Sequence, residues 1–371
     1  MKITQKKIFL LFILSGALLA LSFPPVPFPL LAFAALLPLL FAFELDLKPK
    51  RPLLYTYVTF FIYHYASNWW ISSFQAQTDP FLMASGFAVA LVHPFFFMVP
   101  VGAYIFLRNK FGSSTALWLF PFLWLAFEWL HSLGDLAYPW LTIGYTQIYN
   151  SLWIQIADLQ GVWGASFLVV LVNVLILKII LLVRQARKLS NNKKFYVLPG
   201  VKQKIAAIFL IFLIPVSYGV SRKMQFNHER MLKENPVIDV GIMQANMNPW
   251  VKWSSGAMDQ IRLHQDMQDS LEKAAGSLDL AIWSETAIPF VSWDFNEKHR
   301  LNFLTSRIDP VNTSLLTGFS NFYIYAANED IPKTAKYMPY DSSQRFDTFN
   351  AALMLNPKPY DTLNPQFYHK Q

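Results

Sequence analysis

The chain has 371 residues, of which 54% are hydrophobic, 16% aromatic and only 15% charged. This composition is more apolar than that of an average soluble protein, so we expect a lipid bilayer to surround much of the chain. The formal net charge is +8, and residues 1–220 hold 16 of the 31 Lys and Arg but only 6 of the 23 Asp and Glu. Because the basic excess lies between apolar segments, it argues against a nucleic-acid-binding surface and favours topology signals.

The 371 residues contain no cysteine, which excludes disulfides, thiolate metal sites and a cysteine nucleophile within them. At the N-terminus, Lys2, Lys6 and Lys7 precede the apolar residues 8–21, as in a signal peptide. Residues 23–27, Phe-Pro-Pro-Val-Pro, are not a small-residue cleavage site, and more apolar sequence follows them. We therefore expect an uncleaved first membrane span.

Apolar segments recur through residues 1–220, and a helical crossing of a bilayer takes about 20 such residues. They lie near residues 8–22, 28–43, 53–74, 81–107, 114–131, 153–183 and 205–220. The connecting segments alternate between ones that contain Lys or Arg and ones that contain neither. By the positive-inside rule the basic connections and the N-terminus are cytoplasmic, so seven crossings place residue 221 outside the cytoplasm. We expect a membrane bundle over 1–220 and an extracytoplasmic domain over 221–371.

From residue 221 onward, short strands and amphipathic helices replace the long apolar blocks, which is typical of an α/β domain. The expected strands are 237–244, 278–283, 313–319, 321–327, 347–355 and about 366–370, and the expected helices are 256–275 and 296–308. The chain ends within such a strand, so we expect a truncated domain whose unpaired sheet edge makes it marginally stable. The alternative is a natural terminus that docks as an edge strand.

The most informative segment is D-L-A-I-W-S-E-T-A-I-P at residues 279–289. Its glutamate, Glu285, stands where a buried strand runs out into a loop, with one side against the strand and the other open. Such a placement suits a general base. The alternative is a surface glutamate just past a strand, and spacing alone favours that alternative.

This segment resembles the glutamate motif of the apolipoprotein N-acyltransferases, the membrane-anchored branch of the nitrilase (carbon–nitrogen hydrolase) superfamily. Other segments agree in the same order, and the resemblance runs from about residue 15 to the last residue. In the apolar half they are E-W-L-H-S at 128–132, Y-P-W-L-T-I-G-Y-T-Q at 138–147 and G-V-W-G-A-S-F at 161–167. In the second half they are V-G-I-M-Q-A-N at 240–246, V-K-W at 251–253, L-L-T-G-F at 315–319, F-N-A-A-L at 349–353 and F-Y-H-K at 367–370.

The resemblance assigns four site residues. Glu285 matches the catalytic base, and Lys370 matches a lysine that stabilises the oxyanion of a tetrahedral intermediate. Asn350 matches a structural or substrate-orienting amide, with Phe349 in place of the family's tyrosine, and Trp253 matches a loop tryptophan that meets the lipid substrate. The alternatives are a solvated lysine at position 370 and an interfacial aromatic ring at position 253.

The resemblance also implies the chemistry of the whole enzyme. Its cysteine nucleophile has no match here, because it lies downstream of the lysine motif, so we expect this chain alone to form no acyl-enzyme and to be inactive. The implied fold of residues 221–371 is a nitrilase-like α-β-β-α sandwich. The implied donor is a membrane phospholipid and the acceptor is a diacylated apolipoprotein, with no cofactor, metal or nucleic acid. The expected protein is a monomer in the bacterial inner membrane, with its N-terminus cytoplasmic and residues 221–371 periplasmic.

Three other interpretations remain open. The same residues would serve a membrane-anchored nitrilase-type amidase that hydrolyses rather than transfers. A non-catalytic receptor or transporter is disfavoured because the sequence lacks paired intramembrane charges and repeated halves. A separate chain that supplies the cysteine is the third.

Five polar residues of the apolar half need separate interpretation. Glu128, His131, Asp135 and Asp158 lie near the outer ends of expected spans, where they would face the active-site mouth or a lipid headgroup, or would simply close a span. His93 precedes a proline within a span, so we expect a kink and a locally bonded imidazole rather than a metal site.

Overall fold

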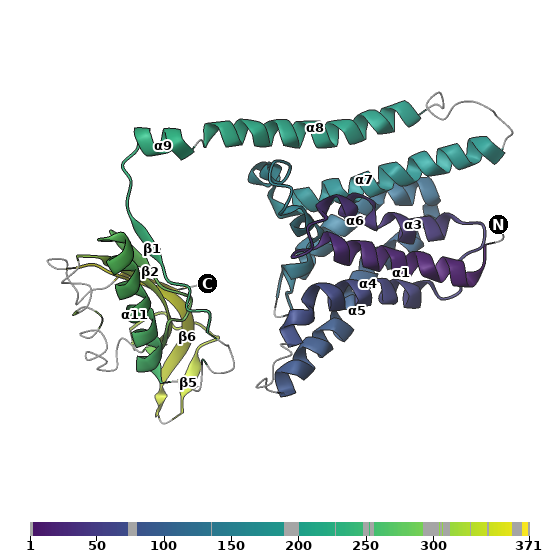
Figure 1. The fold of residues 1–371 in the computed structure, drawn as a ribbon. Helices are drawn as coiled ribbons and strands as arrows, with labels where there is room; N and C mark the ends of the chain where they lie inside the picture. The colour runs from purple at the N-terminus through teal and green to yellow at the C-terminus, as the bar shows by residue number, and fades with distance from the viewer. Residues whose placement is uncertain are drawn as a thin grey trace. The chain divides into compact units, whose positions relative to one another are not determined.

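The computed structural model separates the chain into two compact units, Met1–Met231 and Leu232–Gln371. Figure 1 shows a helical first unit and a second unit built on a sheet. The structure describes residues 3–72, 80–134, 136–188, 200–226, 228–247, 252, 256–291, 304, 306, 312–326, 328–339, 341–357 and 366–369.

The helices of the first unit cover every apolar segment predicted as a span (Figure 1). They are α1 (Gln5–Ser22), α2 (Ala32–Ala35), α3 (Leu37–Glu44), α4 (Pro52–Asn68), α5 (Pro80–Phe111), α6 (Ser113–His131), α7 (Ala157–Lys188) and α8 (Val201–Gln225), followed by the short α9 (His228–Glu234). Single 3-10 turns lie at Pro29–Leu31, Trp69–Ser72, Pro139–Leu141, Ile143–Gln147 and Ile154–Ile156. Within the described residues, four helices are long and apolar enough to cross a membrane, at Gln5–Ser22, Met83–Phe111, Ile154–Arg187 and from Val201 onward.

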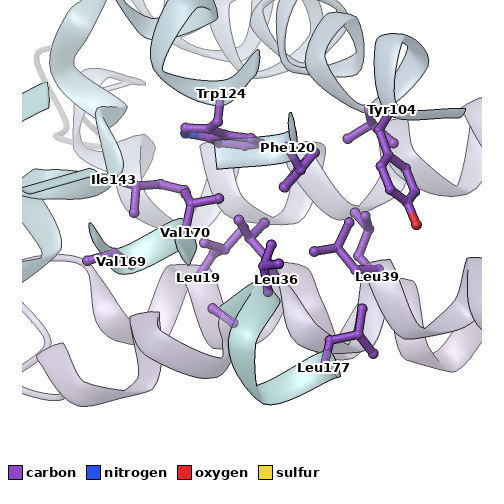
Figure 2. Close-up of a cluster of buried hydrophobic side chains, with 14 of the residues drawn as sticks. Leu19, Leu36, Leu39, Tyr104, Phe120, Trp124, Ile143, Val169, Val170 and Leu177 are labelled. Carbon is purple, nitrogen blue, oxygen red and sulfur yellow. The ribbon is translucent and has the colours of Figure 1, made fainter. Parts of the chain in front are cut away.

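The centre of the first unit is a tightly packed apolar core. Figure 2 shows Leu19 of α1, Leu36 beside α3, Trp124 of α6 and Val170 of α7 meeting there, all without exposed surface. On the outside, large apolar side chains stay exposed, such as Phe95, which is 59% exposed. A bilayer explains this pattern, because van der Waals packing holds such helices together while lipid covers their outer faces.

The segment predicted as one span over 28–43 is broken into a 3-10 turn and two helices. The break between α2 and α3 frees backbone groups that lipid could not satisfy. Asn173 of α7 satisfies them: its Oδ1 accepts from the amides of Leu36 (2.9 Å) and Leu37 (3.1 Å), and its Nδ2 donates to the carbonyl of Ala32 (2.8 Å). One buried amide side chain therefore permits the irregular backbone.

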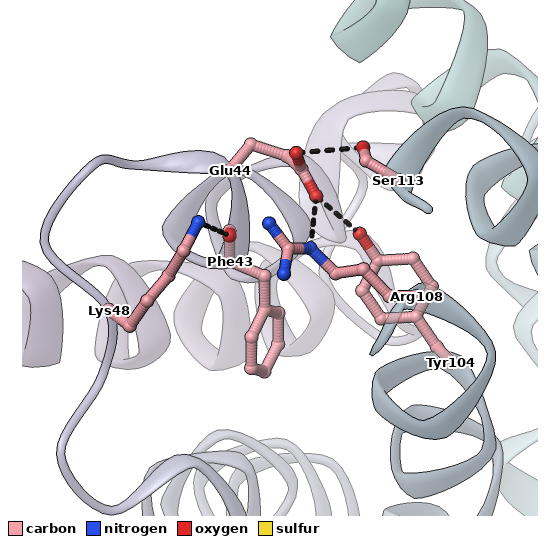
Figure 3. Close-up of polar contacts among 6 residues, drawn as sticks. All are labelled: Phe43, Glu44, Lys48, Tyr104, Arg108 and Ser113. Carbon is pink, nitrogen blue, oxygen red and sulfur yellow. Dashed lines mark hydrogen bonds and ion pairs between the residues drawn. The ribbon is translucent and has the colours of Figure 1, made fainter. Parts of the chain in front are cut away.

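A second polar connection ties α3 to α5 and α6. Figure 3 shows the Glu44 carboxylate accepting hydrogen bonds from the Arg108 Nε (2.9 Å), the Tyr104 hydroxyl (2.8 Å) and the Ser113 hydroxyl (2.8 Å). The Glu44 side chain is only 7% exposed, so its charge requires these donors. The network lies at the ends of the helices where the basic connecting segments begin.

The predicted domain boundary between residues 220 and 221 falls inside α8, which continues to Gln225. Polar contacts with α7 explain the continuation. Asp158 pairs with Arg222 (2.7 Å) and accepts a hydrogen bond from the Tyr218 hydroxyl (2.8 Å). The helix therefore outlasts its apolar segment by more than a turn.

The second unit contains one mixed sheet. Its strands are β1 (Val240–Ile242), β2 (Leu280–Ile282), β3 (Ile288–Val291), β4 (Ser314–Ile324), β5 (Lys336–Met338), β6 (Asp341–Leu355) and β7 (Gln366–His369). The order is β1-β2-β4-β6-β5, with β3 also paired to β4 and β7 also paired to β6. The strands β1, β2, β3 and β4 pair in parallel, whereas β5, β6 and β7 pair antiparallel. The expected combination of membrane-type helices and an α/β domain is thus confirmed at this coarse level.

Some predicted elements of this unit need correction. The strands expected at 313–319 and 321–327 form the single strand β4, because β6 pairs with it without interruption through Ser320 and Asn321. The short strands β3 and β5 were not predicted. The helix expected at 296–308 lies outside the described residues, apart from positions 304 and 306.

One helix, α11 (Ala257–Ala275), covers a face of the sheet. It packs Ile261 into a core with Ala281 and Trp283 at β2 and with Leu315 and Phe319 of β4. Side chains alternate across a strand, so Leu316 and Gly318 lie on the other face of β4. That other face carries the candidate site.

Candidate active site

Glu285 lies in a turn that interrupts one edge of β4. β2 pairs with β4 as far as Leu316, and β3 resumes the pairing at Phe319. Between the two strands the chain leaves the edge and turns back through a hydrogen bond from the Ala287 amide to the Ser284 carbonyl (3.2 Å). The sheet therefore projects Glu285 from a gap in its own hydrogen bonding.

The backbone of this turn is unusual in two ways. Thr286 has a φ of 55°, which is rare for a β-branched residue. The turn also lies directly on Gly318 of β4, where an added Cβ would come within 2.6 Å of the Thr286 nitrogen and 2.8 Å of the Glu285 Cα. Strained backbone of this kind costs about 1–3 kcal/mol and tends to occur at functional sites.

Asn350 of β6 reaches the same turn from the other side of β4. Its Nδ2 donates a hydrogen bond to the Glu285 carboxylate. The two residues are 65 positions apart in sequence, and the register that pairs Asn350 with Ser320 of β4 brings them together. The structure thus unites two of the four predicted site residues.

A cleft of about 350 Å³ opens at this point on the sheet. Glu285 and Asn350 line it, and the rest of its wall is apolar or uncharged. The wall is completed by Ile282, Trp283, Leu316, Thr317, Gly318, Ala351, Ala352 and Tyr368. A single carboxylate in a largely apolar cleft suits a group that transfers protons as a general base.

Lys252 is a site residue that the sequence interpretation missed. Its Nζ donates to the Glu285 carbonyl (3.1 Å). Burial lowers the pKa of Lys252 from its ordinary value, and the charge of Glu285 partly offsets this. The sequence feature that could have identified Lys252 is its position directly before Trp253 in the V-K-W segment.

The other two predicted site residues, Trp253 and Lys370, lie outside the described residues. The strand that precedes Lys370 is described: His369 of β7 pairs with Ala351 of β6, the neighbour of Asn350. Roles for Trp253 and Lys370 remain predictions.

The polar residues of the apolar half have different surroundings. Glu128 is buried and accepts from the Trp124 Nε1 and the Ile143 amide, both at 2.8 Å, so it closes a loop onto α6. Asp158 pairs with α8, as described above, and Asp135 lies outside the described residues.

The expectation of a locally bonded imidazole at His93 is wrong. Among the described residues the His93 Nδ1 has no hydrogen-bond partner. The ring instead contacts the rings of Tyr138 and His131, with centroids 4.4 Å and 5.4 Å apart.

Comparison with known proteins matches both units. Residues 15–175 match the profile of the apolipoprotein N-acyltransferase N-terminal domain. The chain is 27% identical over 357 residues to the apolipoprotein N-acyltransferase of Chlorobaculum tepidum, which covers 95% of this chain and 62% of that protein. It is 28% identical over 288 residues to the protein of that name from Geobacter metallireducens, covering 77% and 52%, and 26% identical over 384 residues to apolipoprotein N-acyltransferase 1 of Treponema denticola, covering 97% and 64%.

The chain therefore spans between 52% and 64% of the length of these curated relatives. The similarity extends well beyond the helical unit, since the match to the Chlorobaculum tepidum protein includes 95% of the chain. The residues that carried the resemblance now lie on the turn, on β4 and on β6, and the chain is similar to the apolipoprotein N-acyltransferases over both units.

Proposed function

We propose that the protein transfers an acyl chain from a membrane phospholipid to the N-terminal diacylglyceryl-cysteine of lipoproteins. The observation that carries the proposal is the Glu285 carboxylate, held by Asn350 in a cleft whose other lining residues are uncharged. The names of the relatives support it, because all three are apolipoprotein N-acyltransferases.

In this proposal Glu285 acts as general base in two steps. It takes the proton of a cysteine thiol, the thiolate attacks the ester carbonyl of the phospholipid, and the lysophospholipid alcohol leaves with that proton. The α-amino group of the lipoprotein then attacks the thioester and gives its proton to Glu285, from which the thiol is restored. In this proposal the cysteine lies in the part of the related proteins that residues 1–371 do not cover. Lys370 is assigned to the oxyanion and Trp253 to the lipid chain.

The relation to the membrane forms part of the same proposal. The N-terminus is cytoplasmic and the sheet unit periplasmic in the bacterial inner membrane, as the alternation of basic connections supports. Both substrates are anchored in that membrane, so anchoring the enzyme beside them raises their effective concentration. We further infer a monomer, and a sheet that forms one half of a nitrilase-like sandwich. Ile242 of β1 supports the sandwich, since this apolar side chain is 72% exposed.

The proposal is tested in the complete protein, which is the full product of the open reading frame that encodes residues 1–371. Purified enzyme is given phospholipid and a diacylated lipopeptide, and the triacylated product is measured. Glu285→Gln keeps the shape but removes the base, so we expect activity to fall by about 10²–10⁴-fold. Glu329→Gln, on an exposed loop of the same unit, is the matched control and should change little.

Two results would count against the proposal. Full activity of Glu285→Gln would show that the base is another group. Release of free fatty acid without transfer to the lipopeptide would favour the amidase alternative, because water would then be the acceptor.

A further inference from the structure

A chain of polar contacts runs from α11 to the turn that carries Glu285. His264 of α11 is fully buried. Its Nδ1 lies 2.8 Å from the Gln260 carbonyl oxygen, and its Nε2 lies 2.8 Å from the hydroxyl of Ser284, the residue before Glu285. The imidazole therefore bridges the helix and the turn.

The partners determine the tautomer of His264. A carbonyl oxygen can only accept, so Nδ1 must carry the proton and donate to Gln260. Burial lowers the pKa of His264 and Lys252 nearby lowers it further, which favours the neutral ring. The Nε2 lone pair then accepts from the Ser284 hydroxyl.

The contacts form a closed ring around the turn. The Gln260 side-chain amide donates to the Lys252 carbonyl, and the Lys252 Nζ donates to the Glu285 carbonyl (3.1 Å). His264 completes the ring by linking Gln260 to Ser284. The turn is thus held at Ser284 by α11 directly and at Glu285 by Lys252, which α11 holds through Gln260.

Trp283 strengthens the attachment on the other side of Ser284. Its ring stacks on His264 with centroids 5.3 Å apart and planes 28° from parallel. Its Nε1 donates to the Gln268 Oε1 of α11 (3.0 Å). A strained residue such as Thr286 persists only where its surroundings over-determine the backbone, and these contacts provide that constraint.

We propose that His264 and Ser284 are a positioning pair that holds the Glu285 turn in its reactive geometry over Gly318. The proposal rests on the function proposed above, in which Glu285 is the base. Neither residue lines the cleft, so the pair acts through Glu285 rather than on substrate.

The test uses the complete protein and four variants: Ser284→Ala, Ser284→Thr, His264→Phe and the double variant Ser284→Ala/His264→Phe. We expect Ser284→Ala and His264→Phe each to lower kcat by about tenfold to a hundredfold, with KM changed less than about twofold, because a base displaced by an ångström loses its alignment. The double variant should be no worse than the worse single one, since both break one interaction. Ser284→Thr keeps a hydroxyl and should restore most of kcat.

A matched control separates positioning from stability. Thr313 also buries a hydroxyl, whose one proton is shared between the Leu278 carbonyl (3.0 Å) and the Glu272 side chain of α11 (3.2 Å), away from the turn. Thr313→Val should lower the unfolding temperature but leave kcat per folded molecule unchanged. If Ser284→Ala behaves as this control does, the pair has only a structural role and the proposal is wrong.

Hydrogen exchange supplies a readout besides activity. Amide exchange of residues 284–288 should accelerate in Ser284→Ala and His264→Phe but not in Thr313→Val. Unchanged exchange, or faster exchange with unchanged kcat, would overturn the pair while leaving the proposed function intact. If the complete wild-type protein transfers no acyl chain, the proposed function is wrong, and the pair then has no catalytic role to support.

Discussion

Asn350 and Glu285 both line the cleft, and their side chains are joined by a hydrogen bond. The Asn350 amide donates to the carboxylate, so it fixes the direction in which the Glu285 side chain points. A hydrogen bond to a charged group contributes about 1.5–3 kcal/mol. Orientation of Glu285 is therefore divided between Asn350 at the carboxylate and the α11 contacts at the backbone.

Replacement of Asn350 tests this division. Asn350→Ala frees the carboxylate, and we expect acyl transfer to fall by about tenfold to a hundredfold, since a donor worth about 1.5–3 kcal/mol is lost. Asn350→Asp should be worse, because it places two carboxylates side by side. The measurement is kcat/KM for the lipopeptide. Equal activity of the two variants would show that the amide donor does not orient the base.

The buried imidazole of His264 gives the sheet unit a predictable response to pH. Its pKa is lowered from the ordinary value of 6.5, chiefly by burial. Between the lowered pKa of His264 in the folded chain and its ordinary pKa in the unfolded chain, the unfolded chain binds more protons. The contribution of His264 to the free energy of unfolding is therefore fully present above about pH 6.5 and is lost as the pH falls.

Denaturant unfolding, followed by tryptophan fluorescence from about pH 7.5 to about pH 5.5, should show this loss. His264→Phe should reduce the slope. His369, whose pKa burial also lowers, should account for part of what remains. A slope that is unchanged by the substitution would exclude His264 as its source.

At the scale of elements, the interrupted edge of β4 is what creates the site. β2 and β3 use the same edge of β4, and the turn between them occupies the gap opposite Gly318. Only a residue without Cβ leaves room there for the turn backbone. The strand thus contributes space rather than a functional group.

Gly318→Ala should therefore be severe for so small a change. The new methyl would lie 2.6 Å from the Thr286 nitrogen, which is backbone and cannot swing away. We expect a loss of about 1–3 kcal/mol of stability together with most of the acyl-transfer activity. Gly102→Ala in α5 is the control, because nothing lies within 4 Å of its added Cβ. Thermal unfolding and the lipopeptide assay measure both effects; a harmless Gly318→Ala would contradict the close approach.

At the scale of the whole molecule, the chain combines a lipid-facing helical unit with a sheet unit that carries the site. The proposed reaction needs both, since its two substrates are anchored in the membrane and its base is on the sheet. The side of the membrane on which the sheet unit lies is therefore decisive for function.

Residues 1–371 contain no cysteine, so the side is measurable by thiol labelling once the proposed nucleophile cysteine of the complete protein has been replaced by serine. Lys50 follows α3 and Lys273 lies on α11, and both are exposed. In intact spheroplasts a membrane-impermeant maleimide should label Lys273→Cys but reach Lys50→Cys only after permeabilisation. The opposite pattern would reverse the proposed topology.

Much of this architecture was predictable from the sequence. Long apolar blocks predicted where the helices of the first unit lie, although the block at 28–43 is broken, and short apolar runs with few polar breaks predicted β1 and β2. The motif around Glu285 gave the position of the candidate base and a resemblance to the apolipoprotein N-acyltransferases, and the comparisons support that resemblance. These features are local, because hydrophobic periodicity and the end of a strand depend only on neighbouring residues.

Only the tertiary structure decided the rest. The bond from Asn350 to Glu285 depends on the β4–β6 register, the support from Lys252 and His264 depends on where α11 packs, and the break at Leu36 is tolerated because Asn173 of α7 lies beside it. Each of these contacts joins residues that are distant in sequence. No local pattern encodes such a contact, since it arises from the packing of whole elements whose cores must be buried together. The sequence by itself therefore determined most of the elements and pointed to the residue proposed to act as the base, and the fold determined what holds that residue in place.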